Sequence, residues 1–287
     1  MRLCLSRPAA VGACCALCAS YVGVLYVGYD TARSRDEPAI IRQRFARVLG
    51  MCAASPLALA LFAAPAGAPV GACAREIDAP ISAWLGLALD RTCLLASAGA
   101  LALTCLLFLG PLFVMDADDW RCVADERFSP TLVNARALLV GPLAEEVVFR
   151  AVMCPLLFAA GLSPASSVLV GSVVFGAAHV HHRVDMRRSW LAVLVMFTYT
   201  ALFGGYSAYL FMRTGRLLPP FVAHAFCNLM GLPDFGAVAR HARPRLAGAA
   251  FVLGLLGFGA LVAADAAWRP HLFGSILWDE RESRIPS

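Results

Sequence analysis

Six ionisable or amide side chains interrupt apolar stretches in the second half of the chain: Glu145, Glu146, Arg150, His179, His224 and Asn228. An ionisable residue at the centre of a bilayer costs on the order of 3 kcal/mol, even on lenient scales. Side chains that converge on one cavity can share partners and water, whereas scattered side chains would each be a separate penalty. We therefore expect the stretches that carry these residues to meet around one site.

The stretch GPLAEEVVFR at 141–150 divides its charges unequally. On a helix, Glu146 and Arg150 are four residues apart and share one face, so they can form an ion pair. Glu145 points about 100° away from Glu146, because a helix has 3.6 residues per turn. No cation lies three or four residues from Glu145. Glu145 therefore needs water or a partner from another helix, and this predicts a functional site.

Two kinds of chemistry suit these residue types. Zinc in catalytic sites takes three protein ligands, and a glutamate with two histidines could supply them, although no HExxH motif is present. Without a metal, Glu145 could take a proton from water while His179 positions or deprotonates that water. His224 and Asn228, four apart on one face, could donate hydrogen bonds to the oxyanion of a tetrahedral intermediate. That assembly would be a peptidase or an amidase.

Structural roles explain some of the same residues. The Glu146–Arg150 pair can be a purely structural staple, and a single intramembrane histidine is more often a packing residue than a catalyst. Asn228 alone would be a hydrogen-bonding contact between helices. His181 and His182 border a polar segment, so we expect them at the membrane interface.

Composition excludes several classes of protein. The 287 residues are 60% hydrophobic and only 15% charged, with a mean hydropathy of +0.71, whereas soluble domains are nearer half apolar and a quarter charged. The 24 basic residues are all arginine, which excludes a lysine Schiff base. No basic run is interleaved with aromatic residues, so nucleic acid is not an expected partner. We expect an integral membrane protein whose partners include membrane lipid.

The elements that must position these residues are long apolar runs. A membrane-spanning helix needs about 20 mostly apolar residues, and such runs cover roughly 9–29, 47–66, 92–115, 134–160, 164–180, 189–212, 217–231 and 246–268. They are too long for the strands of a membrane barrel, so the spanning elements must be helices. The sequence predicts an all-α polytopic integral membrane protein, with about eight transmembrane helices enclosing an intramembrane catalytic cavity.

The runs suggest three parts of the chain. Residues 1–130 hold N-terminal transmembrane helices with an interfacial helix near 84–89, residues 131–235 form the catalytic transmembrane core, and residues 236–287 add a C-terminal transmembrane helix and a polar tail. An arginine-rich loop is expected at 31–47, on the cytosolic side by the positive-inside rule. Seven of the eleven cysteines lie in apolar runs, where free cysteine behaves as a small hydrophobe.

Three motifs in this order resemble those of a known family. EEVVFR fits the EExxxR motif, FGAAH the FxxxH motif and HAFCN the HxxxN motif of the type II CAAX prenyl endopeptidases. These lie within the larger group of bacterial-type CAAX proteases and bacteriocin-processing proteins. The longer stretches GPLAEEVVFRA and FGGYSAYLFMRTGRLLPPFVAHAFCNLMGLP resemble the eukaryotic members in particular. In detail the resemblance covers about 135–235.

The resemblance implies a multi-pass endopeptidase of the endoplasmic reticulum membrane. Such an enzyme removes the aaX tripeptide from proteins whose CaaX cysteine is already farnesylated or geranylgeranylated, with Ras-like small GTPases as the usual substrates. By the family's motifs, Glu145 and His179 activate water, and His224 and Asn228 form the oxyanion hole. Glu146 and Arg150 support the site. The expected enzyme is of the metal-independent glutamate type with no cofactor, and zinc is the alternative.

Two other hypotheses belong to different classes. A proton-coupled transporter or channel could use Glu145 and His179 as a relay, although no internal repeat of the kind common in transporters is visible. A non-catalytic membrane scaffold would keep the bundle without the activity. For the peptidase, the charges of Arg213 or Arg216 suggest where a substrate carboxylate could bind.

Overall fold

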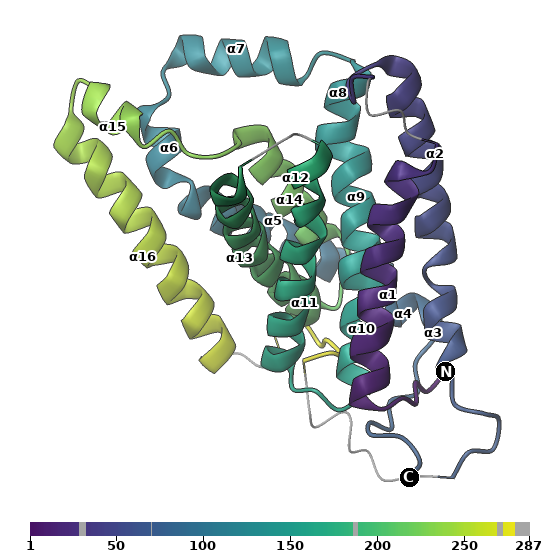
Figure 1. Cartoon of the computed structure of the whole chain (residues 1–287). Coiled ribbons are helices and arrows are strands. Elements are labelled where there is room, and N and C mark those ends of the chain that lie inside the picture. The colour runs from purple at the N-terminus through teal and green to yellow at the C-terminus, as the bar shows by residue number, and fades with distance from the viewer. Residues whose placement is uncertain (29–32, 70, 186–188, 269–271, 279–287) are drawn as a thin grey trace.

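The computed structural model describes residues 1–28, 33–69, 71–185, 189–268 and 272–278 (Figure 1). Within these ranges the chain is helical, and its β contact is an isolated bridge between Leu3 and Ala63. The expected all-α class of a polytopic membrane protein is therefore confirmed. The tail at 279–287 lies outside the described residues.

Five helical segments of the described chain are long and apolar enough to cross a membrane: Arg7–Tyr26, Pro38–Leu61, Pro164–His181, Trp190–Thr214 and Pro244–Asp265. They correspond to α1 (Arg7–Tyr26), α2 (Pro38–Ala54) with α3 (Leu57–Leu61), α11 (Pro164–Ala178) with η3 (His179–His181), α13 (Trp190–Thr214) and α16 (Pro244–Trp268). The other three predicted runs are also helical, but shorter or interrupted. The number of spans, about eight, stays a prediction.

One interrupted run shows that the length of an apolar run does not predict whether it forms one continuous helix. The run at 92–115 forms α5 (Arg91–Leu107) and α6 (Leu109–Val114), with a break at Phe108. Pro111 cannot donate the helical hydrogen bond to the carbonyl four residues earlier, and its ring crowds that carbonyl. Leu112 instead donates to the Phe108 carbonyl at 2.9 Å and restarts the ladder.

The run at 134–160 forms the central rod of the bundle. It consists of α8 (Leu132–Ala135), η1 (Arg136–Val140), α9 (Gly141–Glu146), η2 (Val147–Val152) and α10 (Met153–Ala159), where η1 and η2 are π-helical turns. Every residue of α10 is buried. A helix that is apolar on all sides belongs inside a bundle. Figure 1 shows the teal rod beside α1.

Two helices cross closely beside this rod. A Cβ on Gly204 of α13 would lie 2.9 Å from Phe175 of α11, and one on Gly176 would lie 2.9 Å from the Ala201 methyl group. Small residues let helix backbones approach in a membrane. Ser172 adds a 2.6 Å hydrogen bond to the Ala201 carbonyl. The crossing fixes the position of α11, which carries Phe175 and leads directly into His179.

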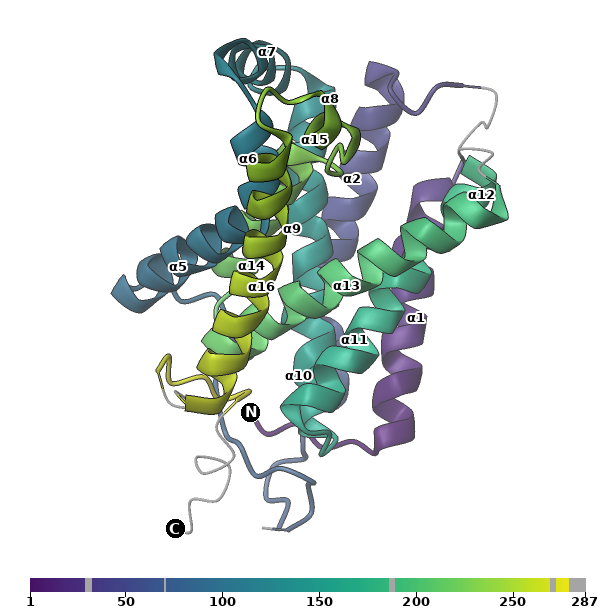
Figure 2. The ribbon, with the colours of Figure 1, turned by 90° about the vertical axis from the view of Figure 1, so that its left-hand side faces the viewer.

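The remaining helices flank this core. The short helix α14 (Leu218–Met230) packs on α5, and α16 packs on α5 and α6 (Figure 2). A charged helix, α7 (Ala117–Arg127), runs across one end of the bundle and begins with a capping box between Asp116 and Asp119. The remaining described elements are three short helices: α4 (Ile81–Trp84), α12 (His182–Asp185) and α15 (Gly236–Arg240).

Two expectations about the N-terminal part are wrong. The arginine-rich loop ends early, because α2 begins at Pro38, a residue whose fixed φ suits the first helical position. The segment at 84–89 is not an interfacial helix, since the helix α4 ends at Trp84. Gly86 has a φ of +66°, a conformation outside a right-handed helix. Trp84 is only 1% exposed and packs in the core.

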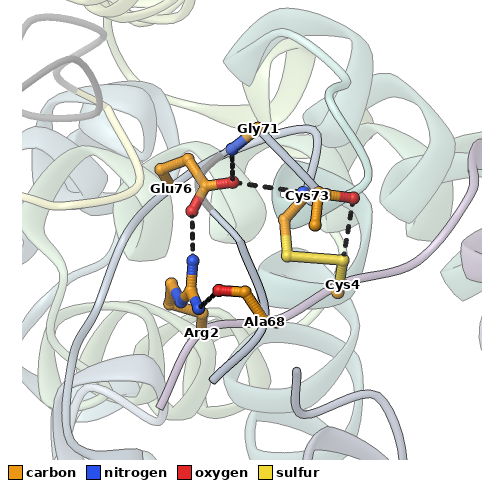
Figure 3. Close-up of a disulfide and its surroundings, with 7 residues drawn as sticks. Arg2, Cys4, Ala68, Gly71, Cys73 and Glu76 are labelled. Carbon is orange, nitrogen blue, oxygen red and sulfur yellow. Dashed lines mark hydrogen bonds and ion pairs between the residues drawn. A yellow bond between two sulfur atoms is a disulfide. The ribbon is translucent and has the colours of Figure 1, made fainter. Parts of the chain in front are cut away.

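A disulfide closes the loop between the N-terminus and α4. Cys4 and Cys73 are bonded, and next to them Arg2 donates to Glu76 at 2.7 Å and to the Ala68 carbonyl at 2.6 Å (Figure 3). The Arg2 hydrogen bond is the main reason that the pKa of Glu76 lies below its ordinary value of 4.5. Both cysteines lie outside the predicted apolar runs, and no local pattern indicated that they pair. Their pairing ties residues 69 positions apart in the chain.

Candidate active site

The four residues expected to act in catalysis line one cavity of about 360 Å³: Glu145, His179, His224 and Asn228. Glu145 comes from α9, His179 follows the last residue of α11, and α14 supplies the other two. The cavity is also bordered by Tyr21 of α1 and Val48 of α2. The three sequence stretches therefore meet around one hollow between the helices, as their shared polarity predicted.

Glu145 and Glu146 face different surroundings. The Glu145 side chain is 22% exposed at the cavity wall, whereas Glu146 is completely buried. Arg150 Nε lies 3.1 Å from Glu146 Oε2, which confirms the ion pair predicted from their spacing. Glu146 accepts hydrogen bonds at both carboxylate oxygens, which offsets part of the cost of burying its charge, whereas Arg150 Nη2 has no hydrogen-bond partner among the described residues.

His224 connects the two glutamates. Its Nδ1 lies 2.7 Å from Glu146 Oε1, and its Nε2 lies 3.7 Å from Glu145 Oε2. The ionised Glu146 carboxylate can only accept, so Nδ1 carries the proton of this hydrogen bond. In the neutral ring Nε2 is then without a proton and faces Glu145. The gap of 3.7 Å is too long for a direct hydrogen bond, and a water can reach both atoms only from the side of the cavity.

Ser207 of α13 completes this network, and the sequence analysis did not include it. Its buried hydroxyl donates to Glu146 Oε2 at 2.5 Å and accepts from Arg150 Nε at 3.0 Å. Glu146 thus receives hydrogen bonds at both of its oxygens from two other helices. No local signal marks Ser207, because one serine in an apolar helix is ordinarily satisfied by its own backbone.

His179 is oriented by the end of its own helix. Its Nδ1 donates to the Phe175 carbonyl at 2.9 Å, since a carbonyl oxygen can only accept. The neutral ring therefore keeps an unprotonated Nε2 for the cavity. Phe175 lies beneath the ring with centroids 4.8 Å apart, and the Arg150 guanidinium covers the same phenyl ring at 4.1 Å.

Asn228 has a structural partner as well as a place in the cavity wall. Its Nδ2 donates to the Ala137 carbonyl at 2.9 Å. In the π turn η1, Gly141 donates to Arg136 five residues earlier, and the next donor would be Pro142, which has no N–H. Asn228 supplies the hydrogen bond that Pro142 cannot. One further Nδ2 hydrogen is left over for a ligand.

The cations suggested for a substrate carboxylate lie elsewhere. Arg213 is buried and bonds Asp265 at 2.7 Å, and Arg216 bonds Asp90 at 2.7 Å. Neither borders the cavity. Its lining instead includes three other arginines and two histidines: Arg35, Arg44, Arg136, His181 and His182. The two histidines thus line the cavity, and their expected place at the membrane interface stays a prediction.

A metal site is not evident from the protein ligands. Among the described residues, no group of three or more His, Cys, Asp or Glu side chains is arranged to hold a metal ion. Glu146 and His224 Nδ1 are already bonded to each other. Glu145, His179 Nε2, His224 Nε2 and the second Nδ2 hydrogen of Asn228 remain available to a small molecule such as water.

The fold and the site define a polytopic helical membrane protein with an acid- and histidine-lined cavity between its helices. Residues 127–230 match the family model of the type II CAAX prenyl endopeptidase Rce1-like proteins. The chain is 36% identical to human CAAX prenyl protease 2 over 93% of this chain and 83% of that protein. It is 34% identical to the rat CAAX prenyl protease 2 over 93% of this chain and 82% of that protein.

A plant relative is similar over a smaller share of the chain. The chain is 39% identical to the CAAX prenyl protease 2 of Arabidopsis thaliana over 44% of this chain and 42% of that protein. No solved structure gave a match. The chain belongs to the type II CAAX prenyl endopeptidase family, a family of membrane proteases.

Proposed function

We propose that this chain is an intramembrane endopeptidase that removes the C-terminal aaX tripeptide from prenylated CaaX proteins. The observation that carries the proposal is the common cavity of Glu145, His179, His224 and Asn228 in a member of a protease family. Farnesylated and geranylgeranylated proteins such as Ras-like small GTPases are the proposed substrates. Residues 131–235 form the proposed catalytic core, with residues 1–130 and 236–287 as its flanking helices.

The proposed step is an attack by water on the peptide bond after the prenylcysteine. A water beside Glu145 gives a proton to the Glu145 carboxylate as its oxygen bonds to the scissile carbonyl carbon. His179 Nε2 accepts a second hydrogen bond from that water and orients it. When the carbon–nitrogen bond breaks, the proton moves from Glu145 to the departing amine of the tripeptide.

Hydrogen-bond donors at the same wall can stabilise the oxyanion. Asn228 offers its remaining Nδ2 hydrogen. His224 donates through Nε2 only when both ring nitrogens are protonated, because Nδ1 is committed to Glu146. Glu146 and Arg150 are positioning residues in this scheme, since they act through His224.

A second hollow suits the prenyl chain. It has a volume of about 380 Å³ and lies between α1 and α11, where apolar and cysteine side chains form most of its wall. It shares Val22, Ala178 and His181 with the first cavity. A prenyl chain gains about 0.8 kcal/mol for each buried CH₂. The lipid anchor can therefore stay in apolar surroundings while its cysteine reaches Glu145.

We also propose an orientation in the endoplasmic reticulum membrane. The disulfide Cys4–Cys73 lies at the end of the bundle that carries the N-terminus, and α8 lies at the other end beside Arg136 (Figure 1). Disulfides persist in oxidising compartments such as the lumen. The cavity-lining Arg35 and Arg136 then face the cytosol, in agreement with the positive-inside rule.

The deciding experiment uses the purified full chain and a farnesylated CaaX peptide. We expect release of the tripeptide that is unchanged by a strong chelator and is lost in Glu145→Gln and His224→Ala. Glu145→Gln should remain folded, because the Glu145 side chain is partly exposed at the cavity wall. Activity lost on chelation and restored by zinc would overturn the metal-independent mechanism. Full activity of Glu145→Gln would overturn the assignment of the base.

A further inference from the structure

Charge is distributed unequally around the catalytic cavity. Of the described residues that line it, Glu145 is the sole carboxylate, whereas Arg35, Arg44 and Arg136 supply three guanidinium groups. Arginine binds carboxylates through two parallel hydrogen bonds, which gives both affinity and direction. The cavity therefore has a carboxylate where the water would be activated and three cations elsewhere in its lining.

The distance between Glu145 and Arg136 matches the length of a short peptide. Glu145 and Arg136 lie on the same helical rod, nine residues apart. At 1.5 Å per residue this separation is about 13 Å. Three extended residues span about 10 Å, and the long arginine side chain covers the remainder. A tripeptide with its scissile bond at Glu145 thus brings its terminal carboxylate to Arg136.

Arg136 is held ready in this position. Its Nη2 bonds Asp36 at 2.7 Å and its Nη1 bonds the Arg35 carbonyl at 3.0 Å. Asp36 is 56% exposed and does not line the cavity, whereas Arg136 is 21% exposed and does. Asp36 therefore orients the guanidinium from the solvent side. Arg44 is 8% exposed and adds a second cation from α2.

We propose that Arg136, with Arg44 and Arg35, binds the free C-terminal carboxylate of the substrate. This site rests on the proposed function and deepens it, because a fixed distance from Arg136 to Glu145 selects the peptide bond three residues from the end. The prenyl group anchors one side of the scissile bond, and the carboxylate anchors the other. Substrates with a blocked or displaced carboxylate lose the second anchor.

A competing explanation is that the arginines only bind lipid phosphates at the membrane surface. Cationic residues at the cytosolic ends of helices do so commonly. In that case the substrate carboxylate would not matter to cleavage. The two explanations therefore predict different responses to the chemical form of the peptide terminus.

The test compares two farnesylated peptides, one ending in a free acid and one in a carboxamide, with the full-length chain in detergent micelles. We expect kcat/KM to be about 10- to 100-fold higher for the acid, the range for a hydrogen-bonded charged group. Arg136→Gln and Arg44→Gln should bring the acid-to-amide ratio close to one. Arg42→Gln is the matched control, because Arg42 is an exposed residue of α2 that does not line the cavity.

The acid-to-amide ratio of kcat/KM also separates the possible outcomes. Because both peptides meet the same enzyme sample, partial misfolding of a variant cancels from the ratio. A ratio near one in the unmodified chain, or the same ratio in Arg136→Gln and Arg42→Gln, would overturn the carboxylate site while leaving the proposed peptidase intact. If the unmodified chain cleaved neither peptide, the proposed function would fail, and the carboxylate site with it.

Discussion

Replacing Ser207 with alanine tests the network that holds Glu146. The Ser207 hydroxyl is buried between the Glu146 carboxylate at 2.5 Å and Arg150 Nε at 3.0 Å. Alanine removes both hydrogen bonds but leaves the direct contact of 3.1 Å between Arg150 and Glu146. The two ions can therefore replace part of what they lose, and the chain should still fold.

The size of the free-energy loss in Ser207→Ala follows from this partial compensation. A hydrogen bond to a charged group contributes about 1.5–3 kcal/mol, and Ser207→Ala loses two while one ion pair tightens. We expect a net loss of about 2 kcal/mol, which is close to 30-fold if it is expressed in catalysis. Because Glu146 acts through His224, the loss should fall on kcat more than on KM.

The assay is cleavage of a farnesylated CaaX peptide with kcat and KM measured separately, together with the melting temperature. Ser167→Ala is the matched control, since Ser167 is equally buried and its hydroxyl has no hydrogen-bond partner among the described residues. Ser167→Ala should leave activity unchanged. If Ser207→Ala matched Ser167→Ala in kcat, the idea that Ser207 positions Glu146 would be refuted.

Three further predictions concern stability. Glu146→Ala should destabilise the fold by about 3–5 kcal/mol, because Arg150 would remain buried without its partner, and a Glu146→Leu, Arg150→Met double variant should regain much of the melting temperature but no peptidase activity. Replacing Cys4 and Cys73 with serine should cost about 4 kcal/mol for a loop of this length, measured by thermal unfolding, and an unchanged melting temperature would contradict it. The lowered pKa of Glu76 adds stability at pH values above its ordinary pKa of 4.5. This stability is lost as the pH falls through the pKa that Glu76 has in the folded state. Limited proteolysis of residues 64–79 should therefore accelerate on acidification in wild type but not in Glu76→Gln.

The sequence was sufficient for the class of fold. Long apolar runs with few charges force helices in a membrane, because each backbone polar group must be satisfied within its own segment. Helical periodicity was also enough to separate Glu145 from Glu146 and to pair Glu146 with Arg150, because contacts four residues apart are local. These predictions depend on the helix alone and not on how the helices pack.

Local breaks in the helices were less visible from the sequence. The start of α2 at Pro38 and the end of α4 at Trp84 depend on single residues that favour a first turn or a positive φ. Apolar content, which guided the expected loop at 31–47 and the helix at 84–89, carries no such information. The π turns on either side of α9 likewise leave no mark on a periodicity count.

Only the tertiary structure decided which residues complete the site. The bonds of Glu146 to Ser207 and His224 join residues 61 and 78 positions apart. The arginines that share the cavity with Glu145 are Arg35, Arg44 and Arg136 rather than Arg213. Such pairings depend on how helices cross and rotate, which is set by close packing over many residues. The sequence by itself determined the helices and the chemical groups they carry, and their packing decided which of those groups meet.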